Sequence, residues 1–148
     1  SGHSPYRAMQ QREIKALSAQ QISDAQAGKG LGLALPAELN GYPGPAHVLE
    51  LAVPLGLSDE QKRATQDLFD RMQAQAKALG LQWIEAERAL DRLFSEGKAD
   101  PDSVQAASAR AAQAHGALRA AHLNYHLEML KVLDSEQVAR YQELRGYR

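Results

Sequence analysis

Three histidines of one predicted helix are the side chains of this chain best suited to chemistry. His122 and His126 stand four residues apart, the spacing at which two imidazoles on one helix face bind the same metal ion. His115 lies on the same edge of the helix but about 10 Å away along its axis, too far to share that ion. In the competing interpretation, the histidines cover apolar surface and hydrogen-bond to a neighbouring helix. The sequence leaves both interpretations open.

His47 is a further candidate ligand, although it lies far from the other histidines in the sequence. It follows residues 28–45, where glycine and proline are too dense for a long helix or strand. If this segment folds against the helix that carries His122 and His126, His47 would supply a third ligand. Neutral imidazole suits divalent transition metals, so Cu, Ni, Co or Zn is the expected ion. We expect no cofactor to be required.

The sequence contains no catalytic constellation. The carboxylates Glu85, Glu87 and Asp91 lie beside Arg88 and Arg92 on a polar helix face, where ion pairing at helical spacing is the ordinary explanation. No Ser, His and Asp grouping has the strand, turn and helix context that supports a nucleophile. Cysteine is absent, which excludes disulfides, thiolate metal sites and cysteine nucleophiles. We therefore do not expect an enzyme.

Composition excludes further classes of protein. The 148 residues carry a formal net charge of −1, and only 5% of them are aromatic. A general nucleic-acid binder needs a concentrated basic surface, and a binder of single strands needs aromatic stacking platforms. No apolar run approaches the roughly 20 residues that cross a bilayer. We therefore expect one domain with neither a nucleic-acid partner nor a membrane-inserted segment.

Helical periodicity dominates the chain and predicts an all-α fold. The expected helices cover residues 5–26 with a possible break near 17–18, then 46–52, 59–96, 100–132 and 134–145. The two long helices are joined by a turn of a few residues, so they must lie antiparallel. We expect a long helical hairpin with shorter flanking helices. Residues 1–56 would pack on the hairpin formed by residues 57–148, within one domain.

The first long helix carries two sets of apolar residues. One stripe, spaced by threes and fours from Ala64 through Trp83 to Phe94, is predicted to face the core. Gly80 interrupts this helix and indicates a bend. Leu81 and Ile84 fall outside the stripe, so we expect them to contact a partner chain or a client protein. The alternative is that they are scattered surface hydrophobes, which are common.

A short phrase occurs twice, as Leu57-Ser58-Asp59-Glu60-Gln61 and as Leu133-Asp134-Ser135-Glu136-Gln137. In each copy a leucine precedes a helix-capping residue, and a glutamine follows three positions after the cap. This is a capping box, in which the cap side chain accepts from a backbone N–H and the glutamine reaches back. Its residues are Leu57, Ser58 and Gln61 in the first copy and Leu133, Asp134 and Gln137 in the second.

The repeated phrase, in a cysteine-free helical chain, resembles the LTxxQ motif of the Spy/CpxP family of bacterial periplasmic proteins, which includes a heavy-metal sensor and resistance branch. The resemblance covers about residues 57–145, and both copies depart from the motif because Ser58 and Asp134 replace threonine. It implies a periplasmic protein that forms a curved homodimer and is not an enzyme. Ser1-Gly2-His3 resembles the remnant of an expression tag, and no leader peptide is visible, so the periplasmic location rests on this resemblance.

The resemblance also implies two functions. The first is an ATP-independent chaperone or envelope-stress adaptor, which binds partly unfolded envelope proteins or a membrane-bound signalling partner. The alternative is a metal-binding sensor or heavy-metal resistance protein that uses the histidine-bearing helix face. A helical module whose only role is dimerisation is a third possibility. The resemblance does not explain residues 28–45.

Overall fold

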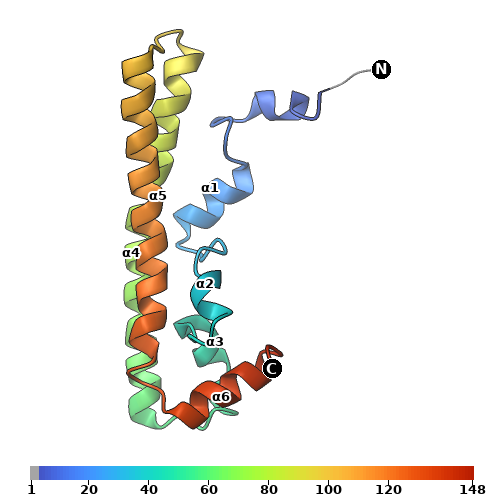
Figure 1. Cartoon of the computed structure of the whole chain (residues 1–148), viewed down its shortest axis with the longest axis vertical. Helices are drawn as coiled ribbons and strands as arrows, with labels where there is room; N and C mark the ends of the chain where they lie inside the picture. The colour runs from blue at the N-terminus through green and yellow to red at the C-terminus, as the bar shows by residue number, and fades with distance from the viewer. Residues whose placement is uncertain (1–3) are drawn as a thin grey trace.

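Two long helices form the body of the protein. The structure is a computed structural model that describes residues 4–148, so the predicted tag remnant at residues 1–3 lies outside it. Helix α4 (Asp59–Ser95) and helix α5 (Pro101–Met129) pack side by side as an antiparallel hairpin (Figure 1). Within residues 4–148 all regular secondary structure is helical, and no helix has the length and apolar character needed to span a membrane. The predicted all-α hairpin is confirmed.

Shorter helices flank the hairpin on one side. They are η1 (Arg7–Gln11), α1 (Ala19–Gln26), α2 (Leu35–Glu38), α3 (Pro45–Glu50) and α6 (Ser135–Leu144). The first four follow one another along the hairpin, and α6 lies across its open end (Figure 1). Helix α1 packs on α4, α2 packs on α5, and α3 contacts both long helices.

Two predicted boundaries need correction. Residues 5–26 do not form one helix, because a short 3₁₀ helix and α1 are separated by residues 12–18. Helix α2 was not expected, since it lies in the glycine- and proline-rich segment 28–45. Pro36 occupies the first turn of this helix, where a backbone N–H has no partner within the helix, so its absence costs no hydrogen bond. Proline therefore starts this short helix instead of preventing it.

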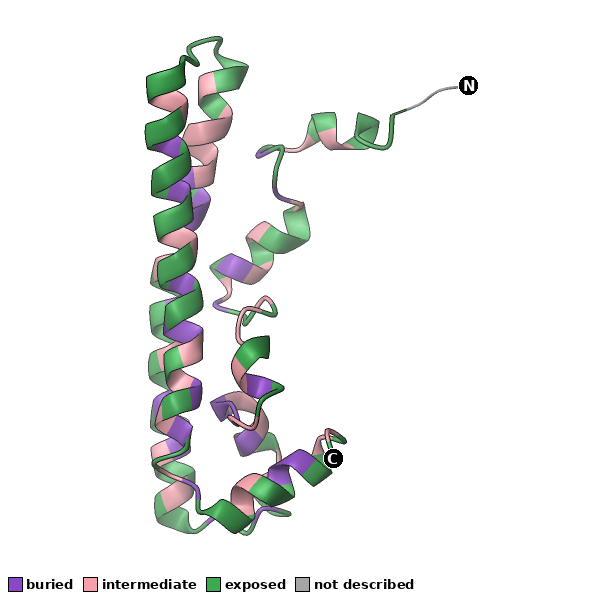
Figure 2. Cartoon of the chain, viewed as in Figure 1, coloured by how far each residue is buried: buried purple, intermediate pink, exposed green. Residues whose placement is uncertain are grey.

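The apolar core consists of two separate clusters of buried residues. We call the first the upper cluster: Ile14, Leu17, Ala25, Ala76, Trp83, Ile84 and Leu118. We call the second the lower cluster: Val48, Leu55, Leu57, Leu68, Met129, Leu133 and Tyr141. Figure 2 shows buried positions along the inner side of the hairpin and on the flanking segments that face it. The clusters attach the N-terminal segment near the middle of the hairpin, and α3 and α6 at its open end.

The upper cluster corrects the prediction for Ile84. This side chain is 1% exposed and packs in the same cluster as Ile14 and Leu17, so the chain itself covers it instead of a partner or client. Trp83 is in the core, as its place on the stripe predicted. Phe94, at the far end of that stripe, is 62% exposed, so the stripe does not face the core along its whole length.

Gly80 has a different role from the predicted bend. Helix α4 continues through it, and the residue is buried where the end of α1 approaches. A Cβ atom at Gly80 would lie 2.5 Å from the carbonyl oxygen of Ala25, closer than such atoms approach. Glycine is therefore required here because the backbones of α1 and α4 nearly touch.

The structure contains both capping boxes and joins them to each other. Ser58 caps α4 with Gln61, and Asp134 caps α6 with Gln137. The two glutamine amides also pair, with each Nε2 donating to the other Oε1 at 2.8 and 3.0 Å. The Gln61 amide donates in addition to the Val132 carbonyl at 2.9 Å. This pair fixes the start of α6 against the start of α4.

Replacing Gly80 with alanine should destabilise the protein. The new methyl group would collide with the Ala25 backbone, so we expect the free energy of unfolding to fall by about 1–3 kcal/mol in urea denaturation. Gly116 is the matched control, because it is also helical but has no atom within 4 Å of its missing Cβ. Gly116→Ala should raise stability by about 0.5–1 kcal/mol. Equal effects of the two substitutions would contradict the close approach at Gly80.

Replacing Gln61 with alanine should also destabilise the protein. The variant loses half of the α4 capping box, both amide bonds to Gln137 and the bond to the Val132 carbonyl, which should cost about 1–3 kcal/mol. Chemical denaturation would measure the loss, with Gln105→Ala on the exposed face of α5 as the control. An effect of Gln61→Ala no larger than that of the control would show that the amide pair is not stabilising.

Candidate functional site

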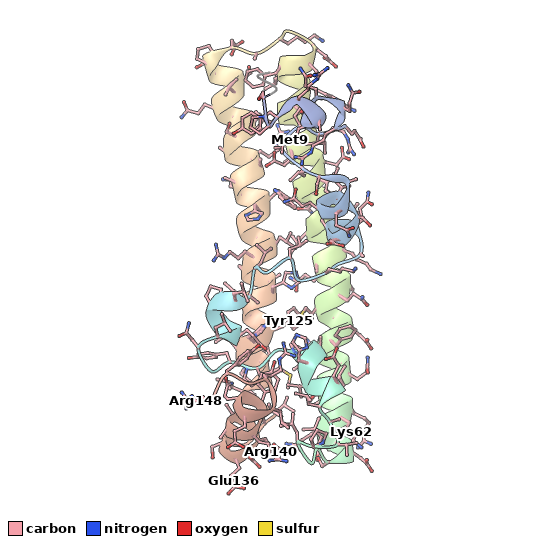
Figure 3. The ribbon with its side chains drawn as sticks, turned by 90° about the vertical axis from the view of Figure 1, so that its right-hand side faces the viewer. Met9, Lys62, Tyr125, Glu136, Arg140 and Arg148 are labelled. Carbon is pink, nitrogen blue, oxygen red and sulfur yellow. The ribbon has the colours of Figure 1, made fainter. Side chains whose placement is uncertain are left out.

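A pocket of about 370 Å³ separates the two apolar clusters. Helix α4 contributes Phe69, Met72 and Gln73 to its wall, and α5 contributes His122 and His126. The remaining wall comes from the connecting segment between α1 and α3 and from the start of α3, which carries His47. Figure 3 looks onto this side of the hairpin and shows the segment crossing from α4 towards α5 between α1 and α2. The polar side chains of the pocket therefore lie between the two apolar clusters, beneath the segment that connects α1 to α3.

His122 is buried in this wall without a hydrogen bond to its Nε2 atom. The side chain is 3% exposed, and no residue of the described chain 4–148 bonds that nitrogen. Burial lowers the pKa of His122, and the positive charge that His126 can carry lowers it further, against an opposing contribution from the Lys29 backbone. The ring is therefore held in its neutral form.

His126 is held in a defined orientation. Its Nδ1 lies 2.6 Å from the carbonyl oxygen of Tyr42. A carbonyl can only accept, so in the neutral ring Nδ1 carries the proton and Nε2 keeps its lone pair. This kind of bond orients metal-binding histidines in other proteins. Gly44 makes the arrangement possible, since a Cβ there would lie 2.7 Å from Cε1 and 2.8 Å from Nε2 of His126.

Glu38 is the buried acid of the pocket, and sequence reasoning missed it. It is 7% exposed, and its Oε1 accepts from the hydroxyl groups of Tyr141 and Tyr147, the latter at 3.0 Å. Arg145 Nε lies 3.8 Å from the same oxygen. Burial raises the pKa of Tyr141, and the bond to Glu38 raises it further, so this hydroxyl stays protonated and donates. The other oxygen, Oε2, has no partner in the described chain and lies 3.7 Å from His126 Nδ1.

His47 lines the same pocket, but other residues engage both of its ring nitrogens. Nδ1 lies 3.1 Å from Glu50, and Nε2 lies 3.4 Å from an Arg145 nitrogen. His115 is elsewhere on α5, where its ring packs 4.9 Å from the ring of Trp83. Across residues 4–148, no group of three or more His, Cys, Asp or Glu side chains is placed to hold a metal ion. The predicted set of His122, His126 and His47 therefore shares one pocket but is not assembled as a ligand set.

Leu81, the other predicted surface residue, lies far from the pocket on a different face of the hairpin. Its side chain is 51% exposed and lines a groove between α4 and α5 that also contains Arg92 and Arg110. Ile84 does not line this groove, since the N-terminal segment covers it. The structure thus separates two residues that the sequence grouped together.

Comparison with known proteins gives one match. A family model described as heavy-metal resistance matches residues 30–140 of the chain. No curated protein and no solved structure matches it. The matched range contains the three histidines of α5, His47, Glu38 and both capping boxes, and it ends just before Tyr141. The resemblance seen in the sequence, including its heavy-metal branch, is confirmed.

The buried His122 should make stability depend on pH. Its folded-state pKa is lowered, so as pH falls below about 6.5 the unfolded chain takes up a proton that the folded chain refuses. This contribution to stability is complete above that pH and is lost as pH falls towards the folded-state pKa. His122→Gln cannot titrate, so its stability should fall less than that of the wild type between pH 7.5 and pH 5 in urea unfolding. Parallel pH profiles for the two proteins would contradict the assignment.

Proposed function

The chain belongs to the heavy-metal resistance family, and we propose that it binds a transition-metal ion in the pocket between the upper and lower clusters. One observation carries this proposal: two neighbouring buried imidazoles with available nitrogens share the wall of a cavity. His122 Nε2 is buried without a partner in the described chain, and the Tyr42 carbonyl leaves the lone pair of His126 Nε2 free. Unpaired lone pairs are costly in a core and useful in a metal site.

The donors in the pocket fit such an ion. His122 and His126 would hold it, because their spacing on α5 places both rings on one side of the helix. Met72 lines the pocket from α4 and offers a thioether. Two imidazoles suit Zn, Ni, Co and Cu, and a thioether in the set favours copper.

Sequestration or sensing of the metal is the role that we propose, without catalysis. We also propose that the protein works in the periplasm as a homodimer. The family assignment and the resemblance to the Spy/CpxP proteins support both proposals. Genes for metal efflux beside the gene for this chain would strengthen the proposal, and genes for an envelope-stress kinase would weaken it.

A chaperone or stress-adaptor function is the second candidate. Its support is the groove at Leu81, where an exposed apolar side chain lies with Arg92 and Arg110. The surface is smaller than the sequence indicated, because Ile84 is buried. Unfolded envelope proteins or a membrane-bound signalling protein would bind there. Suppression of client aggregation without ATP, lost in Leu81→Asp, would support this function.

Metal binding should depend on the α5 histidines. We expect the double variant His122→Gln/His126→Gln to bind Zn(II), Cu(II), Ni(II) or Co(II) at least about tenfold more weakly than the wild type in calorimetric titrations. Binding by the wild type should weaken below about pH 6, since protonated imidazole is not a ligand. Met72→Leu should weaken binding of Cu(I) more than that of Zn(II).

His115→Gln is the matched control, because it removes a histidine of the same helix that packs on Trp83 outside the pocket. It should leave the affinity unchanged. Wild-type affinity weaker than about 100 μM for every ion, or equal affinity in the double variant, would refute the proposal.

A further inference from the structure

The C-terminal residues of the chain contact the pocket wall at Glu38. Tyr141 and Tyr147 both donate to its Oε1, and Arg145 lies beside the same oxygen. Arg145 also donates from Nε to the Tyr147 hydroxyl at 3.3 Å, and its guanidinium lies 5.7 Å from the centre of that ring. We call Tyr141, Arg145 and Tyr147 the C-terminal clasp. The family match ends at residue 140, so the clasp lies outside the matched range.

The clasp holds two residues of the pocket wall. One is Glu38, whose Oε1 is taken by the tyrosines. The other is His47, whose Nε2 lies 3.4 Å from an Arg145 nitrogen. Both residue types are common metal ligands, and both line the pocket that contains His122 and His126. The clasp therefore engages the two wall residues that could extend the histidine pair to a ligand set of three or four.

We infer that the C-terminal clasp is an autoinhibitory contact that competes with metal binding. With the clasp closed, the described chain has no assembled group of three ligands, although four suitable side chains line one cavity. Release of Arg145 and Tyr147 would free His47 Nε2 to turn towards His122 and His126, and it would leave Tyr141 as the one remaining donor of the clasp to Glu38 Oε1. Because coupling between two sites is reciprocal, a filled pocket must then weaken the clasp as much as the clasp weakens binding.

This inference rests on the proposed function, because it assumes that the pocket binds a metal ion. The contacts of the clasp do not depend on that assumption. Figure 1 shows the C-terminus at the end of α6 that points away from the hairpin. Release of Arg145 and Tyr147 would free residues 145–148, while Tyr141 stays in the lower cluster and the Gln61–Gln137 pair holds the start of α6. The chain thus has a short segment that can respond to the pocket while the rest of the fold stays intact.

The test uses the full chain, with Zn(II) as the probe. Tyr147→Phe removes the hydroxyl that bonds Glu38 and Arg145, and Arg145→Gln removes the guanidinium that contacts His47, Glu38 and Tyr147. We expect each substitution to tighten Zn(II) binding about tenfold in calorimetric titration. Hydrogen exchange of the wild type should become faster at residues 145–148 when Zn(II) is added. The double variant Tyr147→Phe/Arg145→Gln should show fast exchange there with and without Zn(II).

Two controls make similar chemical changes outside the clasp. Tyr125→Phe removes a hydroxyl that donates to Gln75 at 2.9 Å, and Arg140→Gln removes a donor to the Pro54 carbonyl at 3.1 Å. Both should leave Zn(II) affinity unchanged. Thermal unfolding of each variant would show that it is folded before titration.

Failure of the clasp and failure of the proposed function give different results. Clasp variants that bind Zn(II) as the wild type does or more weakly, or a C-terminal segment that exchanges more slowly with Zn(II), would overturn the autoinhibitory contact. Equal binding by wild type and His122→Gln/His126→Gln would overturn the proposed site. Absence of Zn(II) binding in both the wild type and the clasp variants would overturn both.

Discussion

Two helices packed against each other leave part of each apolar stripe facing water, and this constraint governs the rest of the fold. The hairpin of α4 and α5 needs a third layer, which the same chain supplies from both of its ends. The N-terminal segment covers Ile84 and Trp83, and α3 and α6 cover the open end around Tyr141. The segment between α1 and α3 crosses the hairpin from the upper cluster to the lower cluster. The pocket lies beneath this crossing.

The pocket is the place between the two clusters where buried polar groups replace apolar packing. Each apolar cluster is closed by side chains, but the space between them holds His122, His126 and Glu38. Atoms such as His122 Nε2 and Glu38 Oε2 lack partners in the described chain, and each costs about 1–3 kcal/mol. A region selected for stability alone would replace such groups with apolar ones. Departures of this kind concentrate at functional sites, which is why the pocket, and not the exposed hairpin face, supports the proposed function.

Local features of the sequence predicted the helices. The surroundings of individual side chains depend on contacts between distant residues, which the sequence could not show. The capping boxes at Ser58 and Asp134 depend on residues three positions apart, so the start of each helix was readable. Glu38 is engaged by Tyr141, 103 residues later, and no periodicity reports such a contact. Gly80 was read as a bend because glycine weakens helices, whereas the structure uses its missing side chain for the approach of α1. His122 and His126 could be found in the sequence because their spacing is local. The sequence could not show that Glu50 and Arg145 engage the two ring nitrogens of His47.

The amide pair of Gln61 and Gln137 constrains how this sequence can change over evolutionary time. Each side chain both donates to the other and accepts from it, and each also completes a capping box. A carboxylate at either position would lack the N–H group that donates to the Oε1 of the other side chain. A shorter amide would not reach its partner. The two positions are 76 residues apart and yet share one set of hydrogen bonds. Among homologous chains that keep this packing, substitutions at these two positions must therefore occur together, as a co-varying pair.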